Sequence, residues 1–221
     1  MIEARQFELD EIRRAYDRRS WIYSKIVAPL EFNNHRKAIE KAAIRPGDKV
    51  LEVAVGPGKT LLEILKRVGR NNIVHGVDTS SKMLEIAKNA ALDAGYQNID
   101  LRVTDARDLD FPDGTFDVLY NGYMLDLIPL ADMPNILSEY KRVLKPGGRV
   151  VLLNMSKKDD QTLTLYERLY AKLPASFVLY FMGACRPVLM EHTTRKAGFR
   201  EVERELIGGI IPSEIVTGCK A

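Results

Sequence analysis

Short apolar runs alternate with amphipathic stretches between residues 49 and 155 of the chain. The apolar runs are rich in β-branched residues and end at glycine, proline or acidic positions, which is typical of buried strands. They predict strands at residues 49–55, 73–78, 99–104, 116–121 and 149–155, with helices at 59–68, 80–94 and 133–144. This alternation predicts an α/β fold with a doubly wound, mostly parallel sheet.

The two ends of the chain follow other patterns. Apolar positions spaced among charges predict a helix over residues 3–26, broken before Pro29, and a second helix over 33–43. After residue 155 the pattern predicts helices at 157–172, 175–184 and 187–197, then strands at 200–206 and 213–220 that form a final antiparallel hairpin. We therefore expect a single domain in four parts: a helical cap (1–45), a core (46–155), a helical insertion or lid (156–190), and a last helix with the strand pair (191–221).

Composition narrows the function classes. The 221 residues include 33 basic and 30 acidic ones, a balance that does not favour nucleic-acid binding. The charged N-terminus does not resemble a signal peptide, and no apolar stretch approaches the length of a membrane span. Cys185 and Cys219 form neither a disulfide framework nor a metal-binding spacing, so we expect no metal and a cytoplasmic protein.

A glycine turn at residues 50–60, V-L-E-V-A-V-G-P-G-K-T, joins the first predicted strand to a helix. A P-loop would need a glycine at Val53, and a dinucleotide-binding turn would need a small residue at Leu61. Both positions argue against a phosphate ligand. The glycines still allow a ligand to approach the backbone closely.

Acidic residues stand in or after three successive strands. Glu52 interrupts the first apolar run, Asp78 ends the second, and Asp105 follows the third, just before Ala106. A carboxylate at the end of the second strand can accept hydrogen bonds from both ribose hydroxyls. This pattern suits a nucleoside with a positive centre and no phosphate, such as S-adenosylmethionine.

The chain resembles the class I S-adenosylmethionine-dependent methyltransferases, and within them the ubiquinone/menaquinone C-methyltransferases and phospholipid N-methyltransferases. The resemblance covers nearly the whole chain and is strongest in V-L-E-V-A-V-G-P-G (50–58), G-V-D-T-S-S-K-M-L (76–84), D-A-R-D-L-D-F-P-D-G-T-F-D-V-L-Y (105–120) and E-Y-K-R-V-L-K-P-G-G-R-V-V-L-L (139–153). It implies a Rossmann-like fold. One departure is Ala54, where the family usually has glycine; alanine is expected to keep ordinary strand dihedrals there.

The resemblance also implies roles for individual residues. Asp78 would bind the ribose hydroxyls, Asp105 the adenine amine, and Ala106 a ring nitrogen through its N–H. Gly56 and Gly58 would admit the methionyl part, with Asn121 beside it. The expected cofactor-binding set is Glu52, Ala54, Gly56, Gly58, Asp78, Thr79, Met83, Asp105, Ala106, Asn121 and Tyr23.

The methyl acceptor is expected to be small or lipid-like, with a quinone ring carbon or a phospholipid amine favoured. Carbon methylation beside a phenol oxygen benefits from a general base, for which His35 and Asp126 are candidates, with Tyr16 as a third catalytic candidate. The basic run at residues 13–19, next to Trp21, is either a solvated helix face or a peripheral membrane contact. Two alternatives remain: a P-loop-like nucleotide-binding protein, or a protein that binds S-adenosylmethionine without turnover.

Overall fold

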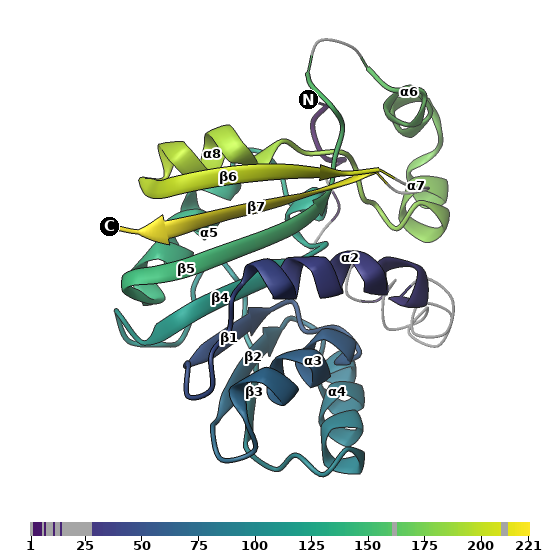
Figure 1. Cartoon of the computed structure of the whole chain (residues 1–221). Helices are drawn as coiled ribbons and strands as arrows, with labels where there is room; N and C mark the ends of the chain where they lie inside the picture. The colour runs from purple at the N-terminus through teal and green to yellow at the C-terminus, as the bar shows by residue number, and fades with distance from the viewer. Residues whose placement is uncertain are drawn as a thin grey trace.

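The computed structural model describes residues 2–5, 7, 11, 14, 28–160, 163–208 and 212–221. These residues form a seven-stranded sheet with the strand order β3-β2-β1-β4-β5-β7-β6 (Figure 1). Strands β1 to β5 are parallel to one another, and β7 pairs antiparallel with both β5 and β6. The strands are β1 (Val50–Val53), β2 (Val74–Asp78), β3 (Ile99–Val103), β4 (Phe116–Gly122), β5 (Leu144–Met155), β6 (Phe199–Ile207) and β7 (Ser213–Lys220).

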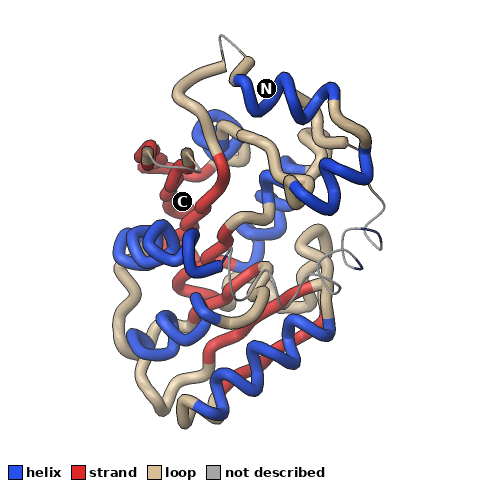
Figure 2. Tube along the Cα trace, turned by 90° about the vertical axis from the view of Figure 1, so that its right-hand side faces the viewer, coloured by secondary structure: helices blue, strands red, loops and turns tan. Residues whose placement is uncertain are grey.

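Helices cover both faces of this sheet, as Figure 2 shows from the side. One apolar core lies beneath α2, α3 and α4, and a second core lies beneath α5 and α8. The helices are α2 (Ala28–Lys41), α3 (Lys59–Val68), α4 (Ser81–Asp93), α5 (Met133–Val143), α6 (Leu165–Lys172), α7 (Ala175–Phe181) and α8 (Met190–Lys196), with a short 3-10 turn, η2, at Leu125–Leu127. The expected Rossmann-like architecture with a final antiparallel hairpin is confirmed.

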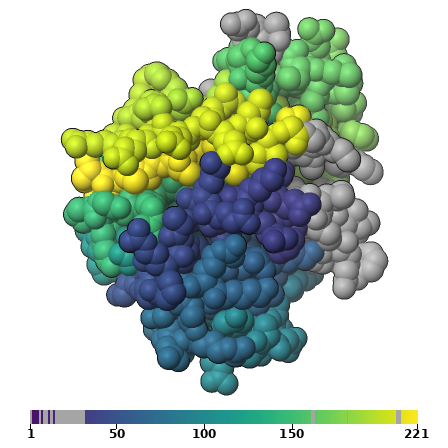
Figure 3. Space-filling model, viewed as in Figure 1, coloured from purple at the N-terminus to yellow at the C-terminus, as the bar shows by residue number. Residues whose placement is uncertain are grey.

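Helix α2 connects the two halves of the molecule. It contacts α3 on one side and β5 and β7 on the other. In Figure 3 it crosses the centre of the molecule, between the blue α3–α4 half and the yellow β6–β7 pair. Ala38 and Ile39 of α2, with Ala42 just after the helix, are buried, and their spacing matches one helical face.

Several boundaries differ from the sequence prediction. Helix α2 begins at Ala28 rather than residue 33, because proline is tolerated in the first helical turn, where its missing N–H would have had no partner. Strand β5 begins at Leu144 rather than residue 149, and it includes Gly147 and Gly148. Helix α6 begins at Leu165 rather than residue 157, since Thr164 caps it. Within the described part of the chain, no helix has the length and apolar character needed to span a membrane.

Candidate functional site

The order in which successive strands are added to the sheet changes direction between β1 and β4. Strand β1 pairs with β2 on one side and β4 on the other, so the connections leaving β1 and β4 diverge at their carboxyl ends. In sheets of this type, ligands bind in the crevice at this switch point. The glycine turn that follows β1 lies at this position.

The backbone amides of this turn are already hydrogen-bonded within the protein. The amides of Ala54 and Val55 both donate to the carbonyl of Val77, at 2.8 and 3.2 Å, and the amide of Gly58 donates to Val55 at 3.2 Å. The amide of Gly56 donates to a carboxylate oxygen of Asp78 at 2.9 Å. Because these four donors are engaged, they cannot hold a phosphate in the way that the amides of a P-loop do.

The two glycines of the turn serve different purposes. A Cβ on Gly56 would meet no heavy atom within 4 Å, so the backbone here borders open space and a ligand can approach it. A Cβ on Gly58 would lie 2.8 Å from the Cα of Ala87 in α4. Gly58 therefore permits the close packing of α3 against α4, whereas the open space lies over Gly56.

Ala54 adopts a left-handed backbone conformation with φ 61°. The expectation of ordinary strand dihedrals at this position was wrong. A side chain with a Cβ costs about 1 kcal/mol in this region relative to glycine. The glycine turn thus begins at Ala54, and the alanine occupies a position whose geometry favours glycine.

Asp78 connects the ends of β1 and β2. One carboxylate oxygen accepts the Gly56 amide and the other accepts the amide of Ser80 at 2.9 Å. Ser80 in turn caps α4 by accepting the amide of Met83 at 3.1 Å. Asp78 therefore holds the turn and the start of α4 in fixed positions while it borders the crevice.

Glu52 carries a carboxylate inside the sheet. Its side chain is 2% exposed, and its Oε2 has no hydrogen-bond partner within the described residues. Burial, together with the nearby charge of Asp78, raises the pKa of Glu52 well above its ordinary value. A buried acceptor without a partner costs free energy unless a ligand supplies a donor or a positive charge.

Two hollows meet at Ala54. One lies over the glycine turn and is lined by Glu52, Gly56, His35 and Tyr120, among others. The other is mostly apolar, and its lining includes Val77, Thr104, Met124, Ile128 and Ile136. The predicted residues Asp78, Thr79, Asp105 and Ala106 line the second hollow.

Asp105 is paired with Arg107. The guanidinium lies 2.7 Å from one carboxylate oxygen and also reaches Asp132 at 3.2 Å. Burial raises the pKa of Asp105, but the hydrogen bonds from Arg107 outweigh this effect and keep the pKa below its ordinary value. Asp105 is therefore an ionised hydrogen-bond acceptor at the rim of the apolar hollow.

Two other predicted residues are less accessible. Asn121 is fully buried in β4; its Nδ2 donates to the Val53 carbonyl at 3.0 Å and its Oδ1 has no partner among the described residues. Met83 is 3% exposed on α4 and lines neither of the two hollows.

His35 lies on α2 and faces the end of β4. Its Nδ1 is 2.7 Å from the hydroxyl of Tyr120 and 3.1 Å from Oγ1 of Thr60. Burial lowers the pKa of His35 to about 4, so the imidazole is neutral at pH 7. Tyr120 and Thr60 were not among the predicted site residues; Tyr120 follows an apolar strand pattern, and only the fold brings it to His35.

Asp126 is fully buried and lines neither hollow. Its Oδ2 accepts the amide of Met155 at 3.1 Å, and its Oδ1 has no partner among the described residues. Burial raises its pKa to about 7. The guanidinium of Arg186 donates to the Asp126 and Ile128 carbonyls at 2.9 and 2.8 Å, so this cluster joins the end of β4 to the segment after α7. The remaining candidates, Tyr16 and Tyr23, lie outside the described residues.

Comparison with known proteins identifies the family. A family model described as the ubiE/COQ5 methyltransferase family matches residues 7–185. The chain belongs to this family. It is 40% identical over 194 residues to the demethylmenaquinone methyltransferase of Symbiobacterium thermophilum, covering 78% of this chain and 76% of that protein. It is 34% identical over 166 residues to the 2-phytyl-1,4-naphtoquinone methyltransferase of Synechococcus elongatus, covering 73% of this chain and 70% of that protein.

Solved structures of similar fold include other methyltransferases. A SAM-dependent methyltransferase from Aquifex aeolicus has a TM-score of 0.65 at 18% identity and covers 98% of this chain and 100% of that one. The phosphoethanolamine N-methyltransferase 2 of Haemonchus contortus, bound to S-adenosyl-L-methionine, has a TM-score of 0.68 at 17% identity. The match covers 94% of this chain and 56% of that one. At these identities they show the fold alone. With its family established, the chain is an S-adenosylmethionine-dependent methyltransferase.

Proposed function

We propose that the protein methylates a ring carbon of a quinone that carries an apolar chain, with S-adenosylmethionine as the methyl donor. The likeness to the two quinone methyltransferases, at 40% and 34% identity over more than two thirds of each protein, carries the assignment of the acceptor. A phospholipid amine is the second candidate acceptor, but the phosphoethanolamine enzyme resembles this chain at 17% identity, which supports a common fold only.

The residues of the site fit this cofactor. Glu52 places an unpartnered carboxylate oxygen beside the open space over Gly56, and a cationic ligand group satisfies such an oxygen. The apolar hollow, with Asp78 and Asp105 at its border, suits a nucleoside: an apolar surface for the base and ionised acceptors for hydroxyl and amine donors. We assign the methionyl end to the first hollow and the adenosyl end to the second.

The chemistry requires alignment more than acid–base groups. When bound, the cofactor supplies an electrophilic methyl group whose bond to sulfur breaks as the bond to the ring carbon forms. The fixed turn between Ala54 and Gly58 and the buried Glu52 hold the reacting end in one orientation, which provides much of the rate enhancement. The ring proton of the acceptor must also leave.

His35 is the proposed route for that proton. It borders the same hollow as Glu52 and is neutral at pH 7, so it retains a nitrogen lone pair. Tyr120 and Thr60 fix the orientation of its ring. His35→Asn is therefore expected to lower kcat roughly 100-fold, in the range found for general bases, with cofactor affinity unchanged. Arg36→Gln, an exposed neighbour on α2, is the matched control and should leave kcat at the wild-type value.

The acceptor is tested directly by methyl transfer. The protein is incubated with methyl-labelled S-adenosylmethionine and either a reduced demethylmenaquinone or phosphatidylethanolamine, and the products are separated and counted. We expect label on the quinone ring carbon. Label on the phospholipid amine would contradict the acceptor assignment, and binding of the cofactor without transfer to either would indicate a non-catalytic protein.

A further inference from the structure

Exposed apolar side chains gather in one short stretch of the protein. Nine large apolar side chains are exposed among the described residues, and five of them lie between residues 163 and 180. They are Leu163, Leu165, Leu169, Phe177 and Tyr180, with exposed fractions of 39% to 73%. The remaining four, Ile73, Leu92, Val103 and Leu206, are separated along the chain.

Helix α6 exposes apolar side chains that a helix of an ordinary soluble domain would bury. Such helices turn an apolar face to the core and a charged face to water. In α6 the outward side chains include Leu165 (73% exposed) and Leu169 (46% exposed), whereas the charged Glu167 is fully buried. The spacing of four residues between Leu165 and Leu169 places both on one face.

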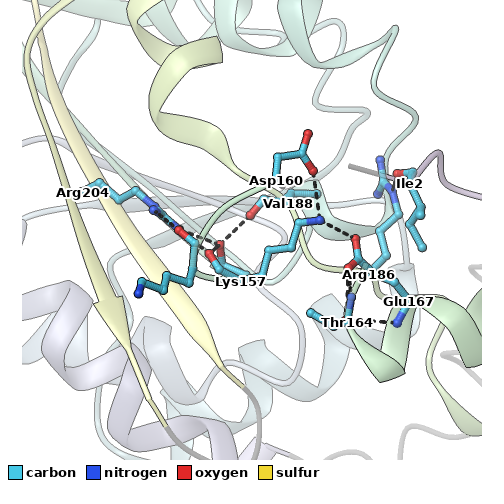
Figure 4. A network of polar contacts seen from close by, with 10 residues as sticks. Ile2, Lys157, Asp160, Thr164, Glu167, Arg186, Val188 and Arg204 are labelled. Carbon is cyan, nitrogen blue, oxygen red and sulfur yellow. Dashed lines mark hydrogen bonds and ion pairs between the residues drawn. The ribbon is translucent and has the colours of Figure 1, made fainter. Parts of the chain in front are cut away.

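The inward face of α6 is held firmly, so the apolar outward face is a stable feature. Glu167 accepts a hydrogen bond from the ammonium group of Lys157, whose side chain is 4% exposed, at 2.9 Å. Its other oxygen accepts the amide of Thr164 at 2.8 Å, forming a capping box (Figure 4). The hydroxyls of Tyr166 and Tyr170 donate to the carbonyls at residues 185 and 184, which anchors the helix to the segment after α7.

The exposed charges of this segment are of one sign. Between residues 163 and 189 the charged side chains are Glu167, Arg168, Lys172 and Arg186, and of these only the basic Arg168 and Lys172 are exposed. Arg168 and Lys172 are also four residues apart, on the same helix as Leu165 and Leu169. Apolar side chains bordered by basic ones suit an anionic membrane surface, where the first enter the acyl boundary and the second bind headgroups.

The position of this surface matches that use. Helices α6 and α7 lie beyond the carboxyl end of β5, on the same side of the molecule as the turn after β1 (Figure 1). An acceptor with an apolar chain would therefore pass from a bilayer into the site on the side of the molecule that carries α6 and α7.

We propose that the outward face of α6 and α7, formed by Leu165, Arg168, Leu169, Lys172, Phe177 and Tyr180, docks on an anionic lipid bilayer. The docking proposal rests on the proposed function, because it supposes a lipid-like acceptor. Vesicle binding is measured without methyl transfer, so failure of the docking proposal can be told apart from failure of the proposed function.

Vesicle binding tests the proposal. The full chain is mixed with vesicles of phosphatidylglycerol and phosphatidylcholine or of phosphatidylcholine alone, and the bound fraction is measured by sedimentation. We expect binding to the anionic vesicles only, weakened by added salt. Leu165→Gln with Leu169→Gln should weaken binding about tenfold or more. Arg168→Gln with Lys172→Gln should weaken it about fivefold for each charge removed.

The chain supplies a matched control. Ile73 and Leu92 are 51% and 44% exposed and lie in the α4 half of the molecule, so Ile73→Gln with Leu92→Gln removes similar apolar area elsewhere. This variant should bind vesicles like the wild type. The proposal fails if the wild type does not bind anionic vesicles, or if the control loses as much binding as the α6 variant. It also fails if the α6 substitutions dissociate an oligomer, measured by light scattering, and leave vesicle binding unchanged, because the surface is then a protein interface.

Discussion

The carboxylate of Asp78 accepts the backbone amide of Gly56 at 2.9 Å, across 22 positions of sequence. This contact fixes the turn after β1 to the end of β2. It also engages the amide that a phosphate-binding turn would direct at its ligand. The same side chain that is expected to bind ribose therefore determines the shape of the turn.

Replacing Asp78 with alanine is expected to affect both properties. The loss of two charge-assisted hydrogen bonds, to the amides of Gly56 and Ser80, should lower the free energy of unfolding by about 2–4 kcal/mol. Binding of S-adenosylhomocysteine should weaken as well. Urea denaturation and calorimetry measure the two effects. Asp93→Ala, at an exposed position of α4, is the control and should change stability by less than about 0.5 kcal/mol. Wild-type affinity in Asp78→Ala would contradict the ribose assignment.

Glu52→Gln is expected to separate binding from stability. Burial makes the folded chain bind the Glu52 proton more tightly than the unfolded chain does, so this carboxyl lowers stability as pH rises through its raised pKa. Glutamine removes that penalty, and the variant should gain stability relative to the wild type as pH increases. Because glutamine cannot ionise in response to a cation, affinity for the cationic cofactor should fall about 10- to 100-fold. Denaturation at several pH values and calorimetry with S-adenosylmethionine test both. An unchanged affinity would remove Glu52 from the cofactor site.

The left-handed conformation of Ala54 predicts a stabilising substitution. Ala54→Gly relieves the unfavourable φ of 61° and should raise the free energy of unfolding by about 0.5–1 kcal/mol, after the entropy that glycine adds to the unfolded chain. Ala91→Gly, inside α4, should instead lower it by about 1 kcal/mol or more. Denaturation curves compare the two. A loss of stability at Ala54 as large as that at Ala91 would show that the backbone there is not strained.

Asp126 predicts a dependence of stability on pH. Its pKa rises from 3.8 to about 7 on folding, so the folded state binds the proton more tightly and stability falls as pH increases across this window. Asp126→Asn lacks the titration and keeps an acceptor for the Met155 amide. The variant should gain up to about 2–3 kcal/mol relative to the wild type between pH 5 and pH 8. If Asp126→Asn and the wild type differed in stability by the same amount at pH 5 and at pH 8, the claim that the buried carboxyl of Asp126 titrates in this range would be contradicted.

The sequence predicts most of the fold because its periodicity reflects local geometry. The strands around Glu52 and Asp78 and the helices between them follow from apolar patterns, and an acid at a strand end is placed by chain order alone. The start of α6 was wrongly predicted at residue 157, although Thr164 and Glu167 have the spacing of a capping box that marks the true start.

Contacts between distant segments could not be predicted in the same way. The packing of Gly58 against Ala87 depends on how α3 meets α4, and the contact of His35 with Tyr120 joins residues 85 positions apart. The conformation of Ala54 depends on hydrogen bonds to β2 rather than on its own preference. These features come from tertiary structure, which no local pattern encodes.

The central claim is that the open space over Gly56 holds the cofactor, and calorimetric titration with S-adenosylhomocysteine tests it most directly. Gly56 and Gly114 have φ of 55° and 61°, and an added Cβ would meet no atom within 4 Å at either one. Both alanine variants should therefore lose about 1 kcal/mol of stability. Gly114 precedes β4, at the opposite end of the sheet from the turn. We expect Gly56→Ala to weaken cofactor binding about tenfold or more, and Gly114→Ala to bind like the wild type. Equal affinities in the two variants would contradict the placement of the cofactor at this turn.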